Sequence, residues 1–461
     1  MNLPQRFLLT LLAALFASAQ LATAAELVVD RGTLRRLTTL PHGATQTLDA
    51  FPVSPTKSAT IRFERVQIYS DDAHLYVMTA DGRKEVPRSN RIFLRGYSDD
   101  GTARVAMSLN PDGSFAEGNG SGPEGSFVLH DSGTNTLTAK LFESTLPSGF
   151  TFDFHCGNEN VNLDAPAADL ARQLHLATSP DMPSPASTSP SSFRYARIGI
   201  DTDSLFMSRL FANNTTNATN WIAGMFNTMN TMYENNLQVQ LLIGTTIFRT
   251  TVASDPYTGF TPGADTTELN FFANYWKTNE SSIRRSFAIL LSGQEASTSN
   301  SCSASGIAWI NEYCQNGFAS GSNTVGSYSV TQVCTSINID PNGAFDARIV
   351  GHEIGHNFGA WHTHCTNTTT GATPTGTSTI DQCYNQESGQ GCYAGAASCP
   401  ASGSGTIMSY CNFTSVSGCA AGTQNVLQFH ATQVSQVLLP KIASNTPSCL
   451  SIDEIFPDGF Q

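Results

Sequence analysis

Short runs in which polar and apolar residues alternate dominate the first third of the chain, for example at 59–63 and 104–109. Clusters rich in Asp, Asn and Gly separate such runs, for example at 99–101 and 110–113. Alternation with a period of two is typical of half-buried strands, and these clusters are typical of the turns between them. The pattern therefore predicts a mostly β module over 26–162.

A segment dominated by Ser, Pro, Thr and Ala follows at 177–192. Such a composition cannot bury a hydrophobic core, so the segment is expected to be exposed. We predict a linker over 163–192, with a short helix at 163–176, and we expect the precursor to be processed there.

The pattern changes after residue 192, where apolar runs of strand length alternate with segments of helical period. In one of these segments, 217–235, the helical stripe consists of Met and aromatic residues, which indicates core packing. We expect strands at 195–202, 237–248, 287–291, 306–310 and 327–339, and helices at 217–235, 266–278, 344–358 and 430–442. This mixture predicts an α+β or α/β domain over 193–461, with a short C-terminal tail.

The predicted helix at 344–358 carries the residues best suited to chemistry. His352 and His356 are four residues apart, so their imidazoles lie one turn apart on the same face of the helix. This spacing suits two nitrogen ligands of a single zinc ion. Glu353, next to the first histidine, is placed to take a proton from a water molecule that the ion activates.

A third histidine completes the pattern HExxHxxGxxH. A continuous helix could not return His362 to the ion, but Gly359 adopts positive φ at low cost and lets the chain turn. Three histidines and a water molecule make an open catalytic zinc site, whereas structural zinc is closed by four protein ligands. We therefore predict one catalytic Zn²⁺ bound by His352, His356 and His362.

The formal net charge of −13 argues against a nucleic acid or an anionic membrane as partner. The N-terminus resembles a signal peptide over 1–25, with Arg6, an apolar run at 7–17 and small residues at 22–24. The alternative is a membrane anchor, for which the apolar run is too short to span comfortably. We predict a secreted, extracellular protein (periplasmic in transit), which we expect to be a monomer.

The chain contains eleven cysteines, and their distribution is uneven. Cys156 lies alone in the first half, whereas the other ten surround or follow the histidine motif: Cys302, Cys314, Cys334, Cys365, Cys383, Cys392, Cys399, Cys411, Cys419 and Cys449. An exported chain favours disulfides, and ten cysteines can pair fully. Cys156 is then the odd thiol, and the pairing of the others stays open.

The segments 350–359 and 405–410 together resemble the metzincin clan of zinc endopeptidases, and most closely its adamalysin/reprolysin family. The resemblance covers most of 193–450, and 95–118 is similar to a reprolysin propeptide. It implies a twisted mixed sheet with helices, an active-site helix and a methionine turn in which Met408 lies beneath the histidines. It also implies that an edge strand at 306–310 binds extended substrates by strand addition.

The sequence departs from the family pattern in three respects. Thr363 stands where adamalysins carry Asp, and pappalysin-like metzincins share this His-Thr pair. Arg197 and Ser286 occupy positions where the adamalysin calcium site needs acidic residues, so we do not predict structural Ca²⁺. Tyr410, two residues after the methionine, is similar in spacing to a tyrosine of astacins and serralysins that ligates zinc or binds the oxyanion. For Tyr410 that role and simple packing both stay open.

Three further residues have more than one interpretation. The Cys156-Gly157 pair resembles the element of related zymogens that places a thiolate on zinc until the propeptide is removed. A buried free cysteine and a bond to another chain are the alternatives. His364 is a weaker candidate ligand, and Cys365 is expected to be half of a disulfide.

These observations predict a metalloendopeptidase, made as a latent zymogen, that cuts protein or peptide substrates. A zinc-activated water would attack the peptide bond, with Glu353 as general base. Two other functions stay open: a catalytically silent binding or adhesion module on the same fold, and a zinc amidase that acts on a non-protein amide. The intact Glu353 argues against the first, and the predicted edge strand favours peptides over the second.

Overall fold

The computed structural model describes residues 26–28, 31–131, 136–160, 193–312, 314–336, 343–372, 378–387, 392–398, 405–411, 427–445 and 449–450. The predicted signal peptide at 1–25, the predicted linker at 163–192 and the C-terminal tail lie outside these residues. Among the helices in the described part of the chain, none has both the length and the apolar character needed to cross a membrane.

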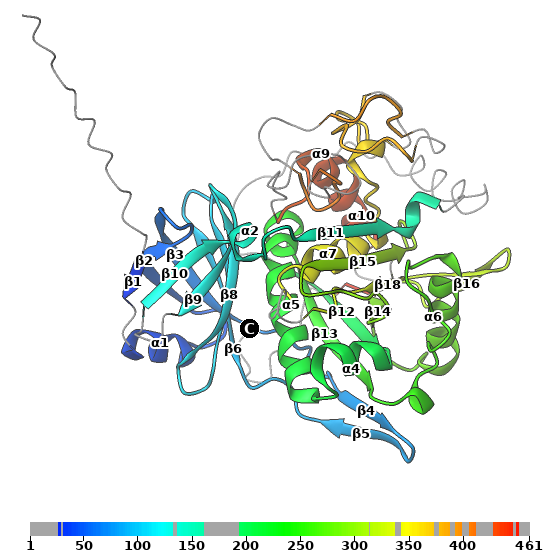
Figure 1. Cartoon of the computed structure of the whole chain (residues 1–461), viewed down its shortest axis with the longest axis horizontal. Helices are drawn as coiled ribbons and strands as arrows, with labels where there is room; N and C mark the ends of the chain where they lie inside the picture. The colour runs from blue at the N-terminus through cyan, green and yellow to red at the C-terminus, as the bar shows by residue number, and fades with distance from the viewer. Residues whose placement is uncertain are drawn as a thin grey trace, which may run out of the picture.

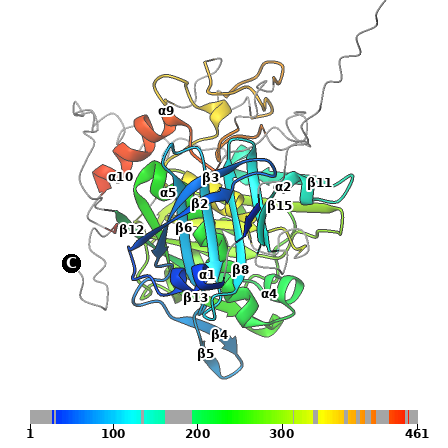
Figure 2. The same ribbon diagram turned by 90° about the vertical axis from the view of Figure 1, so that its left-hand side faces the viewer.

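An antiparallel sheet forms most of the N-terminal region, in the order β1-β10-β9-β8-β7-β6-β3-β2 (Figures 1 and 2). Its strands are β1 (Glu26–Val28), β2 (Thr45–Pro52), β3 (Ser58–Val66), β6 (Ile92–Ser98), β7 (Arg104–Leu109), β8 (Phe115–Gly122), β9 (Gly125–Asp131) and β10 (Thr136–Leu141). Helix α1 (Arg31–Thr38) packs Leu34 and Leu37 into the core of this sheet. We call residues 31–131 the β module.

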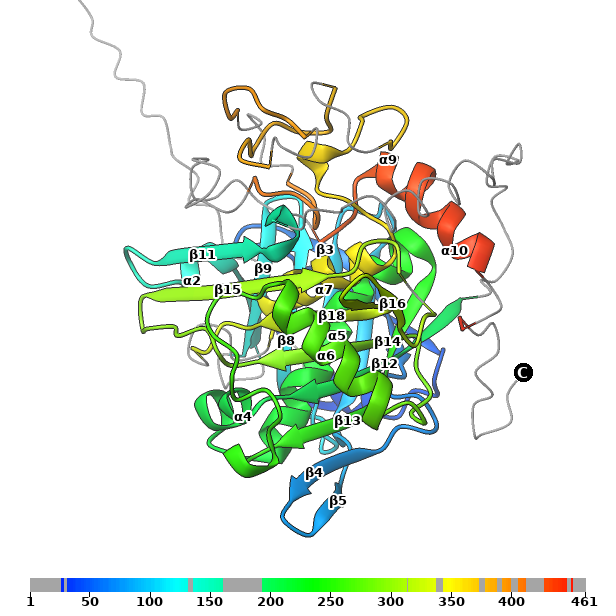
Figure 3. The same ribbon diagram turned by 90° about the vertical axis from the view of Figure 1, so that its right-hand side faces the viewer.

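A second, mixed sheet forms the other half of the molecule, in the order β11-β15-β18-β14-β12-β13-β4-β5 (Figure 3). Most neighbours pair in parallel, whereas β15 with β18 and β4 with β5 are antiparallel. Its strands are β4 (Leu75–Thr79), β5 (Gly82–Val86), β11 (Thr151–Cys156), β12 (Arg194–Thr202), β13 (Val239–Arg249), β14 (Phe287–Ser292), β15 (Ser301–Ala308) and β18 (Tyr328–Gln332). The predicted mixed sheet with helices is confirmed.

The remaining elements are helices and two short strands that form a separate two-stranded sheet. They are α2 (Phe142–Thr145), α4 (Ser204–Phe211), α5 (Thr215–Leu237), α6 (Thr266–Asn279), α7 (Asp346–Asn357), α9 (Ala431–Gln433), α10 (Leu439–Asn445), the short helices η1 (Gly157–Asn160), η2 (Val252–Ser254), η3 (Thr363–Cys365) and η5 (Val434–Leu438), and the strands β16 (Phe318–Ser320) and β17 (Asn323–Val325). Helix α5 lies between the two sheets (Figure 1), and its Met and aromatic stripe is buried, as predicted.

Both edges of the mixed sheet come from the N-terminal part of the chain (Figure 3). Strand β11 lies beside β15 at one edge, and the β4–β5 hairpin lies beside β13 at the other. These three strands fall within the region predicted to be mostly β, but a strand pattern does not say which sheet a strand joins. The part of the chain at 26–162 therefore contributes to two sheets.

Three predicted elements differ in extent. The strand expected at 327–339 is described only at Tyr328–Gln332, and 333–336 are not part of a strand. Strand β15 begins at Ser301, five residues before the predicted start, because its outer half pairs with β11, a partner that local pattern cannot reveal. The predicted helix at 430–442 contains a π-helical turn, η5, directly before α10. Pro440 explains the turn, since it cannot donate a hydrogen bond to the preceding turn and its ring crowds a carbonyl there.

Candidate active site

Three histidines converge where α7 ends, and each uses its Nδ1 for an anchoring contact. The Nδ1 atom of His352 lies 2.8 Å from the Ile407 carbonyl oxygen, and that of His356 lies 2.7 Å from the Ala360 carbonyl oxygen. A carbonyl only accepts, so both Nδ1 atoms carry the proton and leave the Nε2 lone pairs free. The Nδ1 atom of His362 lies 2.7 Å from a carboxylate oxygen of Glu387.

The turn that returns the third histidine depends on Gly359. This residue has φ of +106°, in the left-handed region that glycine adopts at low cost, and it follows the last turn of α7. The chain therefore reverses direction after the helix, and His362 lies in ring contact with both helix histidines. The sequence predicted this use of Gly359.

The four buried groups Cys156, His352, His356 and His362 fit a zinc ion. Their ligand atoms all lie within 4.8 Å of one another, and the Nε2 atom of His352 has no hydrogen-bond partner among the described residues. Imidazole nitrogens and a thiol are the donors that tetrahedral zinc prefers. Burial lowers the pKa of His352 to about 3, and burial with the neighbouring imidazoles lowers the pKa of His356 well below its usual value. Both therefore stay neutral, as ligands must.

Glu353 lies on the same helix and is fully buried. Burial raises the pKa of its carboxyl well above the usual range, and the Cys156 thiol opposes that rise. The side chain lies against β15, where a Cβ atom added at Gly306 would come 2.2 Å from a carboxylate oxygen. Gly306 therefore gives the carboxylate the space to reach the histidines from beside the edge strand.

The segment around Met408 supports the histidines from below. Met408 and Ile407 are buried, and a Cβ atom added at Gly355 would lie 2.8 Å from the Met408 sulfur. The Ile407 carbonyl anchors His352, and the Met408 carbonyl accepts from the Thr363 amide at 3.1 Å and hydroxyl at 3.2 Å. Thr363 thus joins the third histidine to this segment.

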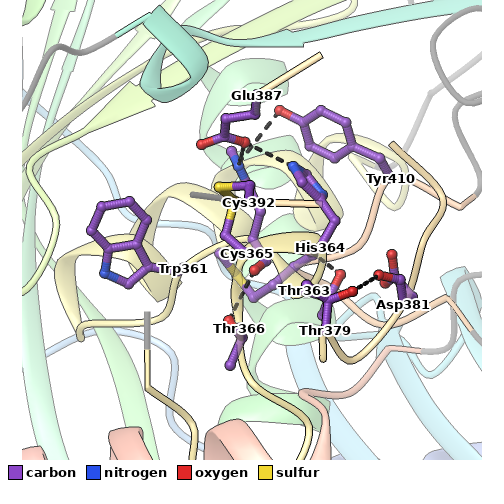
Figure 4. Close-up of a disulfide and its surroundings, with 12 residues drawn as sticks. Trp361, Thr363, His364, Cys365, Thr366, Thr379, Asp381, Glu387, Cys392 and Tyr410 are labelled. Atoms are coloured by element: carbon purple, nitrogen blue, oxygen red, sulfur yellow. Dashed lines mark hydrogen bonds and ion pairs between the residues drawn. A yellow bond between two sulfur atoms is a disulfide. The ribbon is translucent and has the colours of Figure 1, made fainter. Parts of the chain in front are cut away.

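Glu387 is the residue of the site that sequence reasoning missed. One of its carboxylate oxygens lies 2.7 Å from His362 Nδ1 and 2.7 Å from His364 Nε2, and the side chain is buried (Figure 4). Burial alone would raise the pKa of Glu387, but the two imidazoles outweigh it and hold the pKa at about 2. The sequence suggested His364 as a candidate metal ligand. In the structure its Nε2 atom lies within hydrogen-bond distance of the Glu387 carboxylate instead. The sequence offered one signal, since Asp381 and Glu387 are the acidic residues of 366–405.

Disulfides hold the loops around Glu387. The pairs are Cys302–Cys334, Cys314–Cys449, Cys365–Cys392 and Cys383–Cys411. Cys365 is therefore half of a disulfide, as predicted, and Figure 4 shows it beside His364 and Glu387. Cys156 is free and buried, whereas Cys399 and Cys419 lie outside the described residues.

The strand that carries Cys156 occupies the edge of β15. Residues 151–156 pair in parallel with 301–306, and the Cys156 sulfur lies 3.5 Å from His356 Nε2. Just beyond it, the Asn158 amide donates to the Ala308 carbonyl at 2.8 Å and accepts from its N–H at 3.0 Å. We call residues 151–160 the cleft segment.

Tyr410 contacts both the cleft segment and the histidines. Its hydroxyl donates to Glu159 at 2.6 Å and lies 3.4 Å from His362 Nε2. Tyr384 donates to the other oxygen of the same carboxylate. Burial is the largest of the causes that raise the pKa of Tyr410 well above its usual value, so its hydroxyl stays protonated and able to donate.

Helix α7 and the turn at Gly359 bring three histidines together beside the buried carboxylate of Glu353. This arrangement on a mixed sheet is typical of a metallopeptidase domain. Residues 192–419 match the family model Reprolysin_5, described as Metallo-peptidase family M12. The chain therefore carries a reprolysin-like zinc metalloprotease domain, and the family implies protein or peptide substrates.

Solved structures were also compared with the chain. Metalloproteinase-II from Bacteroides fragilis aligns with a TM-score of 0.33 and 11% identity, over 75% of this chain and 90% of that one. A chaperone–substrate complex aligns with a TM-score of 0.25 and 15% identity, over 39% of this chain and 28% of that one. No curated protein matches the sequence.

Proposed function

We propose that the protein is an exported zinc endopeptidase that is made as a latent precursor. One observation carries the proposal: a strand of the chain's own backbone lies along β15 and ends with a thiol at the three histidines. Because β15 pairs with one extended backbone, that of β11, it can also pair with the extended backbone of a substrate. This favours a peptide over a non-protein amide as substrate. The disulfides of the described chain are in keeping with export to an oxidising compartment.

In the active form, His352, His356 and His362 would hold zinc through their Nε2 atoms. Zinc, when bound, would polarise the scissile carbonyl and make water acidic enough to react near neutral pH. Glu353 would accept the proton of the attacking water and deliver it to the amine of the departing peptide. The Tyr410 hydroxyl, once free of Glu159, would donate to the negative charge that develops on the carbonyl oxygen.

In the latent form, the cleft segment would block this chemistry in two ways. Its backbone occupies β15, where a substrate strand would pair, and Cys156 occupies the position next to the histidines that water needs. Its Glu159 carboxylate also engages the Tyr410 hydroxyl. Removal of the segment would therefore free the strand edge, the fourth ligand position and a hydrogen-bond donor together.

The activity can be tested on protein cut at a protease site engineered into 163–192, with and without release of the cleft segment. A mixed peptide library should be cleaved, and a zinc chelator should stop cleavage until zinc is restored. A protein that keeps zinc but cuts no peptide would favour a silent binding module. Cleavage that persists in the chelator would contradict the zinc mechanism.

Latency can be tested with Cys156→Ser in the uncut chain. A hydroxyl is a poorer zinc ligand than a thiolate, so this variant should show some peptidase activity that the uncut wild type lacks. The strand paired with β15 should keep that activity below the activity of protein freed of the cleft segment. His155→Ser, which alters the neighbouring residue of the same strand, is the matched control and should stay latent. An uncut C156S chain that folds, binds zinc and remains silent would count against the thiol's role.

A further inference from the structure

The N-terminal part of the chain pairs with the metalloprotease domain at strand β13 of the mixed sheet. This end of the sheet is opposite the end formed by β11 and β15, where the histidines lie. Strand β4 pairs in parallel with β13, at 75–78 against 246–249. Just before it, the Ile243 amide donates to the Ile68 carbonyl at 2.8 Å and the Ser70 amide donates to the Ile243 carbonyl at 3.0 Å. The β4–β5 hairpin thus continues the sheet of the metalloprotease domain, and its removal would leave β13 as an open edge.

The same stretch fills part of the hydrophobic core of the metalloprotease domain. Ile68, Tyr69 and Leu75 are at most 8% exposed and belong to the cluster that includes Ile243 and Phe248 of β13. Withdrawal of the β module would carry these side chains into water and leave voids among their partners. Burial of large apolar side chains is a main source of stability, so the burial of all three strongly favours the bound state.

Buried polar contacts join the β module to helix α5 as well. Arg95 of β6 lies 2.7 Å from Glu234, with side chains 1% and 10% exposed. The Asn227 amide donates at 3.2 Å to the carbonyls of Leu94 and Met107, one on each of two neighbouring strands. Separation would leave a buried charge or amide without its partner on each side, which is costlier than the loss of a surface ion pair.

The cleft segment is attached in a different way. Its contacts lie around the histidines: the pairing with β15, the buried rings of Phe152 and Phe154, the Asn158 amide and the Glu159 carboxylate. An exposed turn, Pro147 to Gly149, connects it to the β module on one side, and the linker that we predict at 163–192 follows on the other. Exposed turns of small residues are typical sites of proteolysis.

We propose that the β module stays bound after processing, as a non-covalent light chain of the enzyme. Two cuts then activate the protein, one in the linker and one in the turn at 147–149, and together they release the cleft segment alone. A single cut in the linker leaves the segment tethered beside its site, at an effective concentration that keeps it bound. The activity part of this inference rests on the proposed peptidase function, whereas retention of the light chain does not.

The experiment uses the full chain with a specific protease site inserted in the linker, in the turn at 147–149, or in both. Size-exclusion chromatography and mass spectrometry then follow the fragments under native conditions. We expect the N-terminal and C-terminal fragments to co-elute in all three proteins. The peptide at 150–160 should be lost only after the double cut, and peptide cleavage should appear only then.

Elution of the N-terminal fragment apart from the metalloprotease domain would overturn the light-chain proposal. Full activity after the linker cut alone would overturn the two-cut requirement. Co-elution with loss of the 150–160 peptide but no peptidase activity would support the light chain and count against the proposed function instead.

A pair of variants sharpens the retention test. Glu234→Gln removes the charge on α5 that pairs with Arg95 of β6, so the doubly cut protein should release its light chain at least about 10-fold more readily. Lys57→Met breaks the partly exposed Lys57–Glu124 pair within the β module and should change nothing measurable. Equal retention in the E234Q and K57M proteins would contradict the role given to the buried pair.

Discussion

The first two histidines of the motif and the third are held by different means. His352 and His356 lie on one helix and bond to backbone carbonyls within the same packed region. His362 lies after the helix and bonds to the carboxylate of Glu387, in a loop closed by disulfides. Helix geometry fixes the first pair, whereas a charged side chain from a separate segment positions the third. The same ion would therefore have a rigid side and an adjustable side.

The largest expected effect lies on the rigid side. Glu353→Gln keeps the size and position of the side chain but removes its ability to accept a proton. Turnover in the doubly cut protein should fall by about 10²–10⁴-fold while zinc content is unchanged. Metal analysis and peptide cleavage measure the two quantities separately. Undiminished turnover in a zinc-loaded E353Q protein would contradict the assignment of the base.

The next effect lies on the adjustable side. Glu387→Gln removes the charge that orients His362, and loss of such an outer-shell partner costs about 10–100-fold in metal affinity. Competition with a chromogenic chelator measures zinc affinity directly. Asp381→Asn, in the same loop but without a bond to a histidine, is the control and should change it much less. Equal zinc affinities for the E387Q and D381N proteins would contradict the role given to Glu387 in positioning His362.

A smaller effect is expected when the loop is loosened. Replacing both Cys365 and Cys392 by Ala frees the segment that carries Glu387, so zinc affinity should fall several-fold. Replacing both Cys314 and Cys449 removes a disulfide that bonds no part of this loop. Each double variant should lose about 2–4 kcal/mol of stability, but only the first should lose affinity for zinc. A similar loss of affinity in both would point to a general loosening of the fold.

The smallest effect concerns the metal-free protein and pH. The pKa of His352 is about 3 in the folded state against 6.5 when unfolded, so the unfolded state binds more protons between these values. Stability should therefore fall as pH drops through this window, by at most about 1.4 kcal/mol per pH unit for this group.

His362 should behave in the opposite way. Burial lowers its pKa, but Glu387 outweighs this and the net pKa is raised, so its contribution favours the folded state at low pH. Urea denaturation across pH should give a shallower dependence for His352→Gln and a steeper one for His362→Gln. Identical slopes for the two variants would show that both sides of the site titrate alike.

The same division explains what could be predicted from the sequence. His352, Glu353 and His356 follow from helical spacing, and the position of His362 follows from Gly359, because these are properties of neighbouring residues. Glu387 could not be placed, since its contact spans 25 residues through a loop whose path depends on disulfide pairing. Spacing alone could not choose that pairing.

Sheet membership shows the same limit. The mostly β pattern of 26–162 predicts strands there, yet β4, β5 and β11 join a sheet whose other members are β12 and later strands. The sheet that an edge strand joins depends on the backbone with which it pairs in the folded protein. The local sequence pattern says little about that pairing. Helix α5 was easier to predict, because its Met and aromatic stripe is repeated over many turns.

The burial of Cys156 couples the order of folding to the order of oxidation. A free thiolate that can reach a disulfide attacks it and reshuffles the pairing, whereas an inaccessible thiol cannot. Cys156, the last residue of β11, is 1% exposed beside His356, while Cys302, Cys334, Cys383 and Cys411 are paired. An accessible Cys156 would compete for these pairs, so the strand that blocks the site also protects the disulfides around Glu387 from exchange.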